Sequence, residues 1–160
     1  MTGPTLLAAS ASDHEALIAG TAPCGLALPA TPIAPPEVLA MLAGVAAEVG
    51  KTFTPASWLI IDQGTVAGLC SVTRPPDGRT IDIGYGVAPC CQGKGLTTRA
   101  VGELAAWART YGAVDRITAE TSPANIPSQR VLSRNGFVQT GERVDPEDGP
   151  LICWSLDVSE

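Results

Sequence analysis

The amino-acid sequence predicts an α/β (α+β) fold, in which a mixed, mostly antiparallel twisted sheet of about six to seven strands is flanked by about four helices. Apolar segments rich in strand-forming residues follow one another from Ser57 to Val87, with short turns between them. The chain then alternates strand, helix, strand and helix before two closing strands. Its 160 residues are 45% hydrophobic and 16% charged, which predicts one globular domain over residues 1–160.

The N-terminal third is expected to contain one short strand and two helices. Thr5 to Ala9 is predicted as the strand, and Ser12-Asp13 is a helix-capping pair ahead of the first helix. Repeated prolines between Thr21 and Pro36 exclude a regular helix and predict an extended loop. Pro36 then opens a second helix, whose apolar residues recur at helical spacing up to Gly50.

The middle of the chain is predicted to form consecutive antiparallel strands. SWLIID and TVAGLCSVT flank a turn at Gln63-Gly64, and RPPDGRT is a second turn before IDIGYGV. Two adjacent strands joined by such short turns form hairpins, so these segments are expected to be neighbours in the sheet.

The C-terminal half is predicted to begin with a helix from about Gly93 to Tyr111 and a strand from about Arg116 to Thr121. A helix from about Ile126 to Asn135 and two closing strands follow. The first of these helices carries a stripe at helical spacing, which is typical of a face that packs on the core. The stripe consists of Leu96, Ala100, Leu104, Trp107 and Tyr111.

Charge and composition exclude several classes of function. A formal charge of −6 with only 10 Lys and Arg residues argues against nucleic acid as a partner, because a polyanion needs a clustered basic surface. The N-terminus lacks a basic start followed by a continuous apolar segment, and no apolar run approaches the length of a membrane span. We therefore expect a cytoplasmic protein without a membrane partner.

The 5 cysteines lack the C-x-x-C spacing of a structural zinc site, and their odd number disfavours a disulfide framework. No metal is expected. The adjacent pair Cys90 and Cys91 is compatible with a redox role, but buried, inert thiols are the more common case and are the expectation here.

The segment QGKGLT, Gln92 to Thr97, lies between a predicted strand and a predicted helix. Glycine lets the backbone approach a ligand closely, and the first N–H groups of a helix are free donors for an anion. The segment does not fit a Walker loop, because Ala88 stands where the first glycine is required. A dinucleotide fingerprint also fails, because Thr98 stands at its third glycine. An anion site and a simple connecting turn remain open.

Two motifs resemble the GNAT acetyltransferases. QGKGLT is similar to their acetyl-CoA signature Q/R-x-x-G-x-G/A, with Gln92 and Gly95 in place and Thr97 as a departure at the last position. NIPSQRVLSRNGF, Asn125 to Phe137, resembles the second cofactor motif of the RimJ/RimL-like branch. The resemblance covers about Trp58 to Leu156 and implies a GNAT-type sheet and acetyl-CoA (coenzyme A) as cosubstrate.

The resemblance also implies which residues bind the cofactor. The backbone from Gln92 to Thr97 would hold the diphosphate, and Val87 would pair its backbone with the pantetheine arm. Asn125 and Ser128 would bond the pantetheine, and Arg130 would reach the adenosine phosphate. Lys94 either adds charge near the phosphates or is simply solvated. The residues implied in cofactor binding are Val87, Gln92, Gly93, Lys94, Gly95, Leu96, Thr97, Asn125, Ser128 and Arg130.

The candidate general base is Glu120, in a stretch ETSPAN that resembles the segment carrying the base in ribosomal N-terminal acetyltransferases. It is expected to act through water, with a pKa raised by partial burial. Asp82 is the runner-up, since many GNAT members keep an acid on that strand. His14 lies outside both motifs and is expected to be a surface helix residue.

The candidate acid for the leaving thiolate is Ser128, as usually proposed in the RimJ/RimL branch. Many GNAT members use a tyrosine on the following helix, but Leu132 stands at that place. Ser128 could instead only cap the helix or bond the pantetheine.

The sequence thus predicts an acetyl-CoA-dependent N-acetyltransferase, in which a primary amine attacks the acetyl thioester directly. The acceptor is either a small molecule or a protein N-terminus or lysine, and the protein is a monomer or a homodimer. The alternative is a noncatalytic acyl-CoA-binding module, suggested by Leu132 and Thr97.

Overall fold

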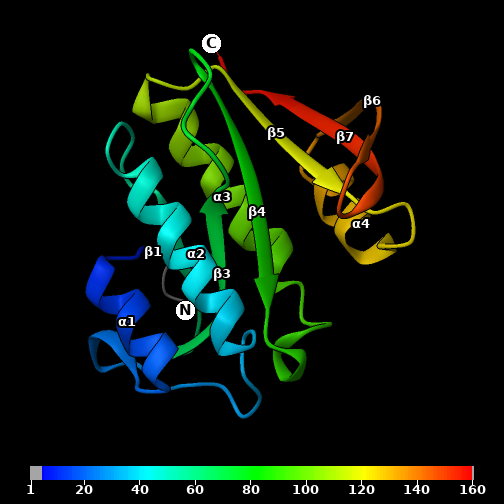
Figure 1. Cartoon of the computed structure of the whole chain (residues 1–160). Coiled ribbons are helices and arrows are strands. Elements are labelled where there is room, and N and C mark those ends of the chain that lie inside the picture. The colour runs from blue at the N-terminus through cyan, green and yellow to red at the C-terminus, as the bar shows by residue number, and fades with distance from the viewer. Residues whose placement is uncertain (1–4, 160) are drawn as a thin grey trace.

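The computed structural model describes residues 5–159, and in this part of the chain seven strands form one sheet in the order β1-β2-β3-β4-β5-β7-β6 (Figure 1). Residues 1–4 and 160 of the expected domain lie outside the described part. The strands are β1 (Leu6–Ala8), β2 (Ser57–Asp62), β3 (Thr65–Val72), β4 (Thr80–Val87), β5 (Arg116–Thr121), β6 (Val138–Asp145) and β7 (Gly149–Asp157). All neighbours pair antiparallel except β4 and β5, which are parallel. The predicted mixed, mostly antiparallel sheet is confirmed.

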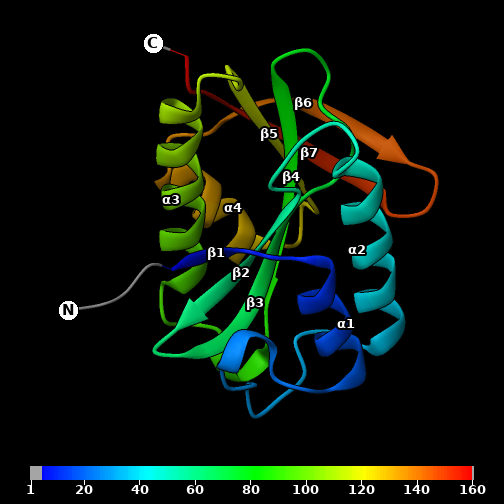
Figure 2. The same ribbon diagram turned by 90° about the vertical axis from the view of Figure 1, so that its left-hand side faces the viewer.

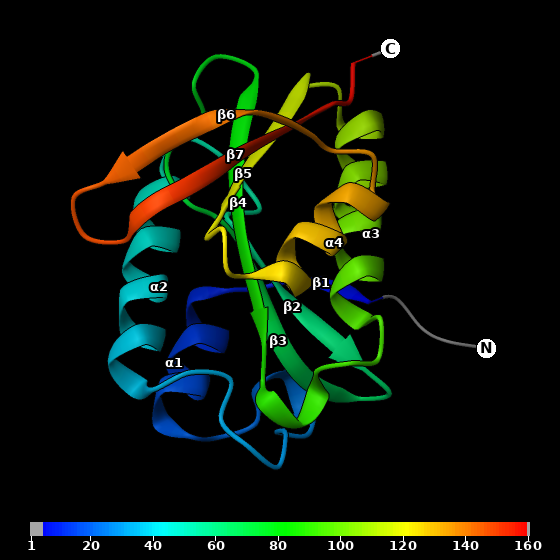
Figure 3. The same ribbon diagram turned by 90° about the vertical axis from the view of Figure 1, so that its right-hand side faces the viewer.

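Helices cover both faces of this sheet. They are α1 (Ala11–Ala19), α2 (Pro36–Val49), α3 (Leu96–Tyr111) and α4 (Ile126–Arg134), with short 3-10 turns η1 (Pro23–Gly25) and η2 (Pro89–Cys91). Figures 2 and 3 show α3 and α4 on one face and α1 and α2 on the other. None of the helices among the described residues is both long and apolar enough to cross a membrane.

The parallel strands β4 and β5 separate before they end. Their pairing runs from Thr80 opposite Arg116 to Ile83 opposite Ala119, and then stops. Beyond this point β4 stays paired with β3 as far as Val87, whereas β5 stays paired with β7. Figure 1 shows the two strands diverging, so the sheet opens into a V whose inner edges are the ends of β4 and β5.

Two predicted helix starts are wrong by a few residues. The N-cap of α1 is Ser10, whose side chain accepts from the Asp13 backbone while Asp13 bonds back to Ser10, a capping box that begins before Ser12. The predicted start of the third helix at about Gly93 is too early, because Gly93 (φ 80°) and Gly95 (φ 72°) are left-handed. That conformation is incompatible with a right-handed helix, so α3 begins at Leu96.

Two side chains differ from their expected exposure. His14 is not a surface residue: it is 4% exposed, and its Nε2 lies 2.8 Å from the Ser57 hydroxyl of β2. Burial lowers the pKa of His14, which is consistent with a neutral ring that joins α1 to the sheet. Tyr111, at the end of the predicted core stripe, is 44% exposed because it occupies the last turn of α3.

Candidate active site

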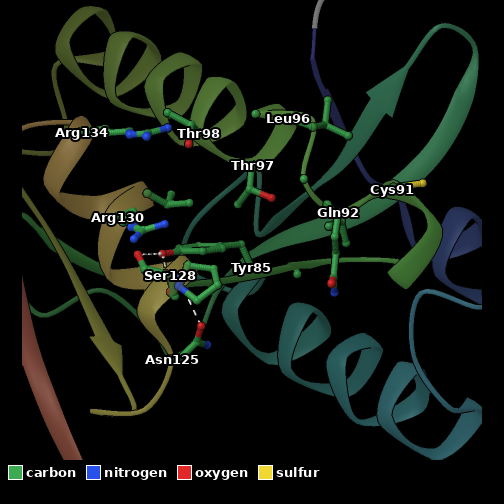
Figure 4. A pocket seen from close by; sticks show the side chains of 16 residues that line it. Tyr85, Cys91, Gln92, Leu96, Thr97, Thr98, Asn125, Ser128, Arg130 and Arg134 are labelled. Carbon is green, nitrogen blue, oxygen red and sulfur yellow. Dashed lines mark hydrogen bonds between the residues drawn. The ribbon is translucent and has the colours of Figure 1, made fainter.

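A cavity of about 760 Å³ lies between the end of β4, the start of α3 and helix α4 (Figure 4). Most residues that the sequence predicts as cofactor ligands line it: Val87, Gln92, Gly93, Gly95, Leu96, Thr97, Asn125, Ser128 and Arg130. Lys94 does not line the cavity; its Nζ lies 3.9 Å from Asp62 Oδ2, and the side chain is 55% exposed. The fold therefore brings the two sequence motifs, one before α3 and one in α4, to a single cavity.

The start of α3 directs backbone N–H groups to this cavity. Gly95 is the N-cap of α3 and, as a glycine, has no side chain that could bond to the N–H groups at this end. Hydrogen bonding to the cap begins with the N–H of Arg99, which donates to the Gly95 carbonyl at 3.1 Å. The N–H groups before Arg99 have no carbonyl partner within the helix. With the positive end of the helix dipole, they form a site for an anion of the size of a diphosphate.

Helix α4 adds positive charge to the same cavity. Arg130 and Arg134 are one helical turn apart and both line it (Figure 4). Arg134 is absent from the residues predicted from the sequence, although its spacing from Arg130 could have indicated it. Guanidinium groups bind phosphate oxygens in a planar, bidentate way, so this end of the cavity also fits a phosphorylated ligand.

Val87 has backbone groups available at the open edge of β4. The N–H of the next residue, Ala88, donates to the Ala67 carbonyl of β3 at 2.8 Å. Because N–H groups alternate in direction along a strand, the N–H of Val87 points away from β3 and toward the gap beside β5. An extended ligand lying in the V can therefore pair with β4 as an additional strand would.

Ser128 and Tyr85 are joined inside the cavity. The Ser128 backbone N–H donates to Asn125 Oδ1 at 3.2 Å, which caps α4, and the Tyr85 hydroxyl lies 2.8 Å from the Ser128 hydroxyl (Figure 4). Burial raises the pKa of Tyr85 to about 12. Sequence reasoning missed Tyr85, which lies in β4 two residues before Val87 and outside both motifs. Leu132, which stands where many GNAT acetyltransferases carry a tyrosine, is fully buried in the core.

The two candidate bases do not line this cavity. Ile83 and Ala119 belong to the core under α3, so their alternating neighbours Asp82 and Glu120 face the opposite side of the sheet. Asp82 is 7% exposed and accepts from the hydroxyls of Thr73 and Thr118, both at 2.6 Å. The Arg74 guanidinium forms a salt bridge with it, with Nη1 3.5 Å from Asp82 Oδ2.

Glu120 is held by an arginine of β6. The Arg143 guanidinium donates to both carboxylate oxygens of Glu120, through Nε to Oε2 and through Nη2 to Oε1 at 2.9 Å. These hydrogen bonds lower the pKa of Glu120. The expected rise of this pKa by burial is therefore wrong: burial acts in that direction, but the paired guanidinium outweighs it.

The adjacent cysteines differ in environment. Cys91 is buried and lines the cavity, whereas Cys90 is exposed, so the expectation of two buried thiols is wrong for Cys90. Their Sγ atoms are 3.6 Å apart and share a hydrogen bond, and both thiols are free rather than joined in a disulfide. Hydrogen bonding with Thr31 lowers the pKa of Cys90 to about 7, and the Cys90 N–H donates to the Thr31 hydroxyl at 3.1 Å.

Comparison with known proteins identifies one family. The profile described as "Acetyltransferase (GNAT) domain" matches residues 5–138. The N-acetyltransferase YjdG of Bacillus subtilis (strain 168), described as uncharacterized, is 31% identical over 85 residues, which is 51% of this chain and 51% of YjdG. The matched region thus spans about half the length of that curated relative.

Solved structures share the fold over nearly the whole chain. RimL, a ribosomal L7/L12 alpha-N-protein acetyltransferase in complex with coenzyme A, superposes with a TM-score of 0.71 at 18% identity, covering 98% of both chains. The aminoglycoside acetyltransferase AAC(6')-Ib, also with coenzyme A, gives a TM-score of 0.66 at 19% identity, covering 96% of this chain and 94% of its own. The fold expected from the two sequence motifs is confirmed.

Proposed function

The chain belongs to the GNAT family of acetyl-CoA-dependent acetyltransferases, and on that premise we propose that it acetylates a primary amine by direct attack on the acetyl thioester. The proposal rests on the cavity and on the groups that line it. These groups are the turn with the left-handed residues Gly93 and Gly95, the start of α3, and two arginines of α4. These groups fit a ligand with a diphosphate and a further phosphate.

The residues around the cavity have distinct proposed tasks. The N–H groups at the start of α3 bind the diphosphate, and Arg130 and Arg134 bind the phosphate of the adenosine. The free backbone edge at Val87 and the side chain of Asn125 hold the pantetheine arm. Acetyl-CoA, when bound, supplies an activated acetyl thioester.

The amine is proposed to approach from the sheet face that carries Asp82 and Glu120, opposite α3 and α4. Removing the proton from an alkylammonium with a pKa of about 10.4 costs roughly 4 to 5 kcal/mol of free energy at about pH 7. The cost is much smaller for an α-ammonium, whose pKa is about 8. Glu120 is proposed as the group that takes this proton through water, with Asp82 as the second candidate. Ser128 is proposed to hold a proton toward the sulfur on the cofactor side.

The state of Glu120 bears on which amines react best. While Arg143 occupies both of its oxygens, Glu120 is a weak base. Acceptors whose amine is partly neutral at about pH 7 then have an advantage over alkyl amines. The neighbours in structure include a protein alpha-N-acetyltransferase and an aminoglycoside acetyltransferase. We propose that this chain also takes an amine-bearing acceptor, with α-amines ahead of lysine side chains.

The test is an acetylation assay over a panel of amines. Purified protein is mixed with acetyl-CoA and with matched peptides that present either a free α-amine or only a lysine side chain, and acceptor mass is measured. A gain of one acetyl group, faster on the α-amine, is expected. Thermal stabilisation by acetyl-CoA without a product on any amine would instead support the noncatalytic acyl-CoA-binding module.

A further inference from the structure

Tyr85 extends from β4 into the proposed cofactor cavity, where its hydroxyl is hydrogen bonded to the hydroxyl of Ser128. The two oxygens are 2.8 Å apart, and the Tyr85 hydroxyl also lies 3.4 Å from the Ser128 carbonyl (Figure 4). Tyr85 lies in the part of β4 that is no longer paired with β5, because that pairing ends at Ile83. Its side chain lines the cavity where the two strands separate. A tyrosine on the sheet and a serine on α4 thus share one hydrogen bond across the cavity.

Two polar side chains next to Ser128 bond to backbone groups rather than to its hydroxyl. Asn125 Oδ1 accepts from the Ser128 backbone N–H, and Gln129 Nε2 donates to the carbonyls of Ser122 and Pro123 at 3.2 and 2.9 Å. Among residues 5–159, Tyr85 supplies the side-chain group that is hydrogen bonded to Ser128 Oγ. The orientation of the Ser128 hydroxyl therefore depends on Tyr85.

A serine hydroxyl has one proton and two acceptor lone pairs. When Tyr85 donates to Ser128 Oγ, the serine oxygen acts as the acceptor and its own proton is free to point into the cavity. Since burial raises the pKa of Tyr85 to about 12, the phenol remains protonated and able to donate at any working pH. The same pKa argues against full proton transfer from Tyr85 to a thiolate, whose conjugate acid has a pKa of about 8.5.

We propose that Tyr85 is a positioning residue that donates a hydrogen bond to Ser128 Oγ and thereby directs the Ser128 O–H, as a hydrogen-bond donor, toward the sulfur of the leaving thiolate. This inference rests on the role proposed above for Ser128. Tyr85 undergoes no covalent step. Its contribution is to fix one rotamer of a hydroxyl that would otherwise rotate.

The experiment compares Tyr85→Phe, Ser128→Ala and the double variant with the wild-type protein. Tyr111→Phe is the matched control, because the chain has only 2 tyrosines and the Tyr111 hydroxyl lies outside the cavity, 3.3 Å from the Thr54 carbonyl. The measurements are kcat, the KM and Kd for acetyl-CoA, and the thermal midpoint of each variant. Tyr85→Phe keeps the ring, so the fold and the cofactor affinity are expected to stay close to wild type.

The expected result is a fall in kcat of about fivefold for Tyr85→Phe, the rate equivalent of one net hydrogen bond, with the Kd for acetyl-CoA changed by less than about twofold. Ser128→Ala is expected to lower kcat by about tenfold or more. The double variant should be no slower than Ser128→Ala alone, because Tyr85 acts only through Ser128. Tyr111→Phe should match the wild type.

Two outcomes would overturn the inference while leaving the proposed function standing. One is a slow Ser128→Ala variant beside an unchanged Tyr85→Phe variant, and the other is losses that multiply in the double variant. A Ser128→Ala variant with wild-type kcat would instead remove the proposed role of Ser128 and, with it, that of Tyr85. A Tyr85→Phe variant that loses thermal stability and cofactor affinity together would show a structural role and would also overturn the inference.

Discussion

Substitution of Gly95 by aspartate tests the anion site at the start of α3. Gly95 has φ 72°, a left-handed conformation that Asp and Asn tolerate better than most residues, and a Cβ added there meets no atom within 4 Å. Gly95→Asp therefore adds a negative charge beside the proposed diphosphate without a steric clash. Gly95→Asn is the matched control, because it has the same shape and backbone cost but no charge.

The size of the effect follows from Coulomb's law. Two like unit charges about 4 Å apart repel by about 4 kcal/mol at an effective dielectric constant of about 20. Gly95 is exposed, so water screens the repulsion and we expect about half of that value. A penalty of about 2 kcal/mol corresponds to a Kd for acetyl-CoA about thirtyfold weaker in Gly95→Asp than in Gly95→Asn.

Isothermal titration of acetyl-CoA into the two variants measures this difference. The ratio of the two Kd values should shrink as salt is raised from about 0.01 to about 1 M, because the Debye length shortens. Equal affinities of Gly95→Asp and Gly95→Asn at low salt would refute the placement of the diphosphate at this helix start.

The clamped carboxylate and the exposed thiol give the remaining predictions. Glu120→Gln is expected to lower kcat most near neutral pH, where the amine needs a base, and least at alkaline pH, where the amine loses its proton to solvent, with the Kd for acetyl-CoA nearly unchanged. A pH profile of wild-type shape transfers the role to Asp82 or to solvent. Because Arg143 lowers the pKa of Glu120, the ion pair contributes stability above the ordinary glutamate pKa, and acidification removes it. The thermal midpoint of Arg143→Gln should therefore fall less between about pH 6 and about pH 3 than that of the wild type, and equal falls would contradict this. The rate of alkylation of Cys90, measured by mass spectrometry, should be half-maximal at about pH 7. The pKa of the exposed Cys24 is raised, so that thiol should react far more slowly, and equal rates at neutral pH would be inconsistent with these environments.

Local sequence patterns predict most of the fold because their causes are local. The turn at Gln63-Gly64 is recognisable since both residues have positive φ, at 48° and 82°, and glycine favours that region. The turn that contains Gly93 and Gly95 is recognisable for the same reason. The start of α1 was misplaced because Ser10, Ser12 and Asp13 can all cap a helix, and only the observed bonds select Ser10.

Long-range contacts account for what the sequence does not predict at the site. Tyr85 meets Ser128 across 43 residues of chain, and nothing in either motif indicates that approach. The pairing of Glu120 with Arg143 depends on the register of β6 against β7, which shifts between Gln139 and Gly141. Such an irregularity moves every following side chain relative to its partner strand, so the clamp on Glu120 and the direction of its pKa require the folded structure.

The most direct measurement of the central claim is the release of free thiol from acetyl-CoA, followed with and without an α-amine peptide. The account predicts release that depends on the peptide, rises with pH as the amine loses its proton, and is strongly reduced in Gly95→Asp at limiting acetyl-CoA but not in Gly95→Asn. Thiol release that is independent of any amine, or equal in the two Gly95 variants, would contradict acetyl transfer from a cofactor bound at the start of α3.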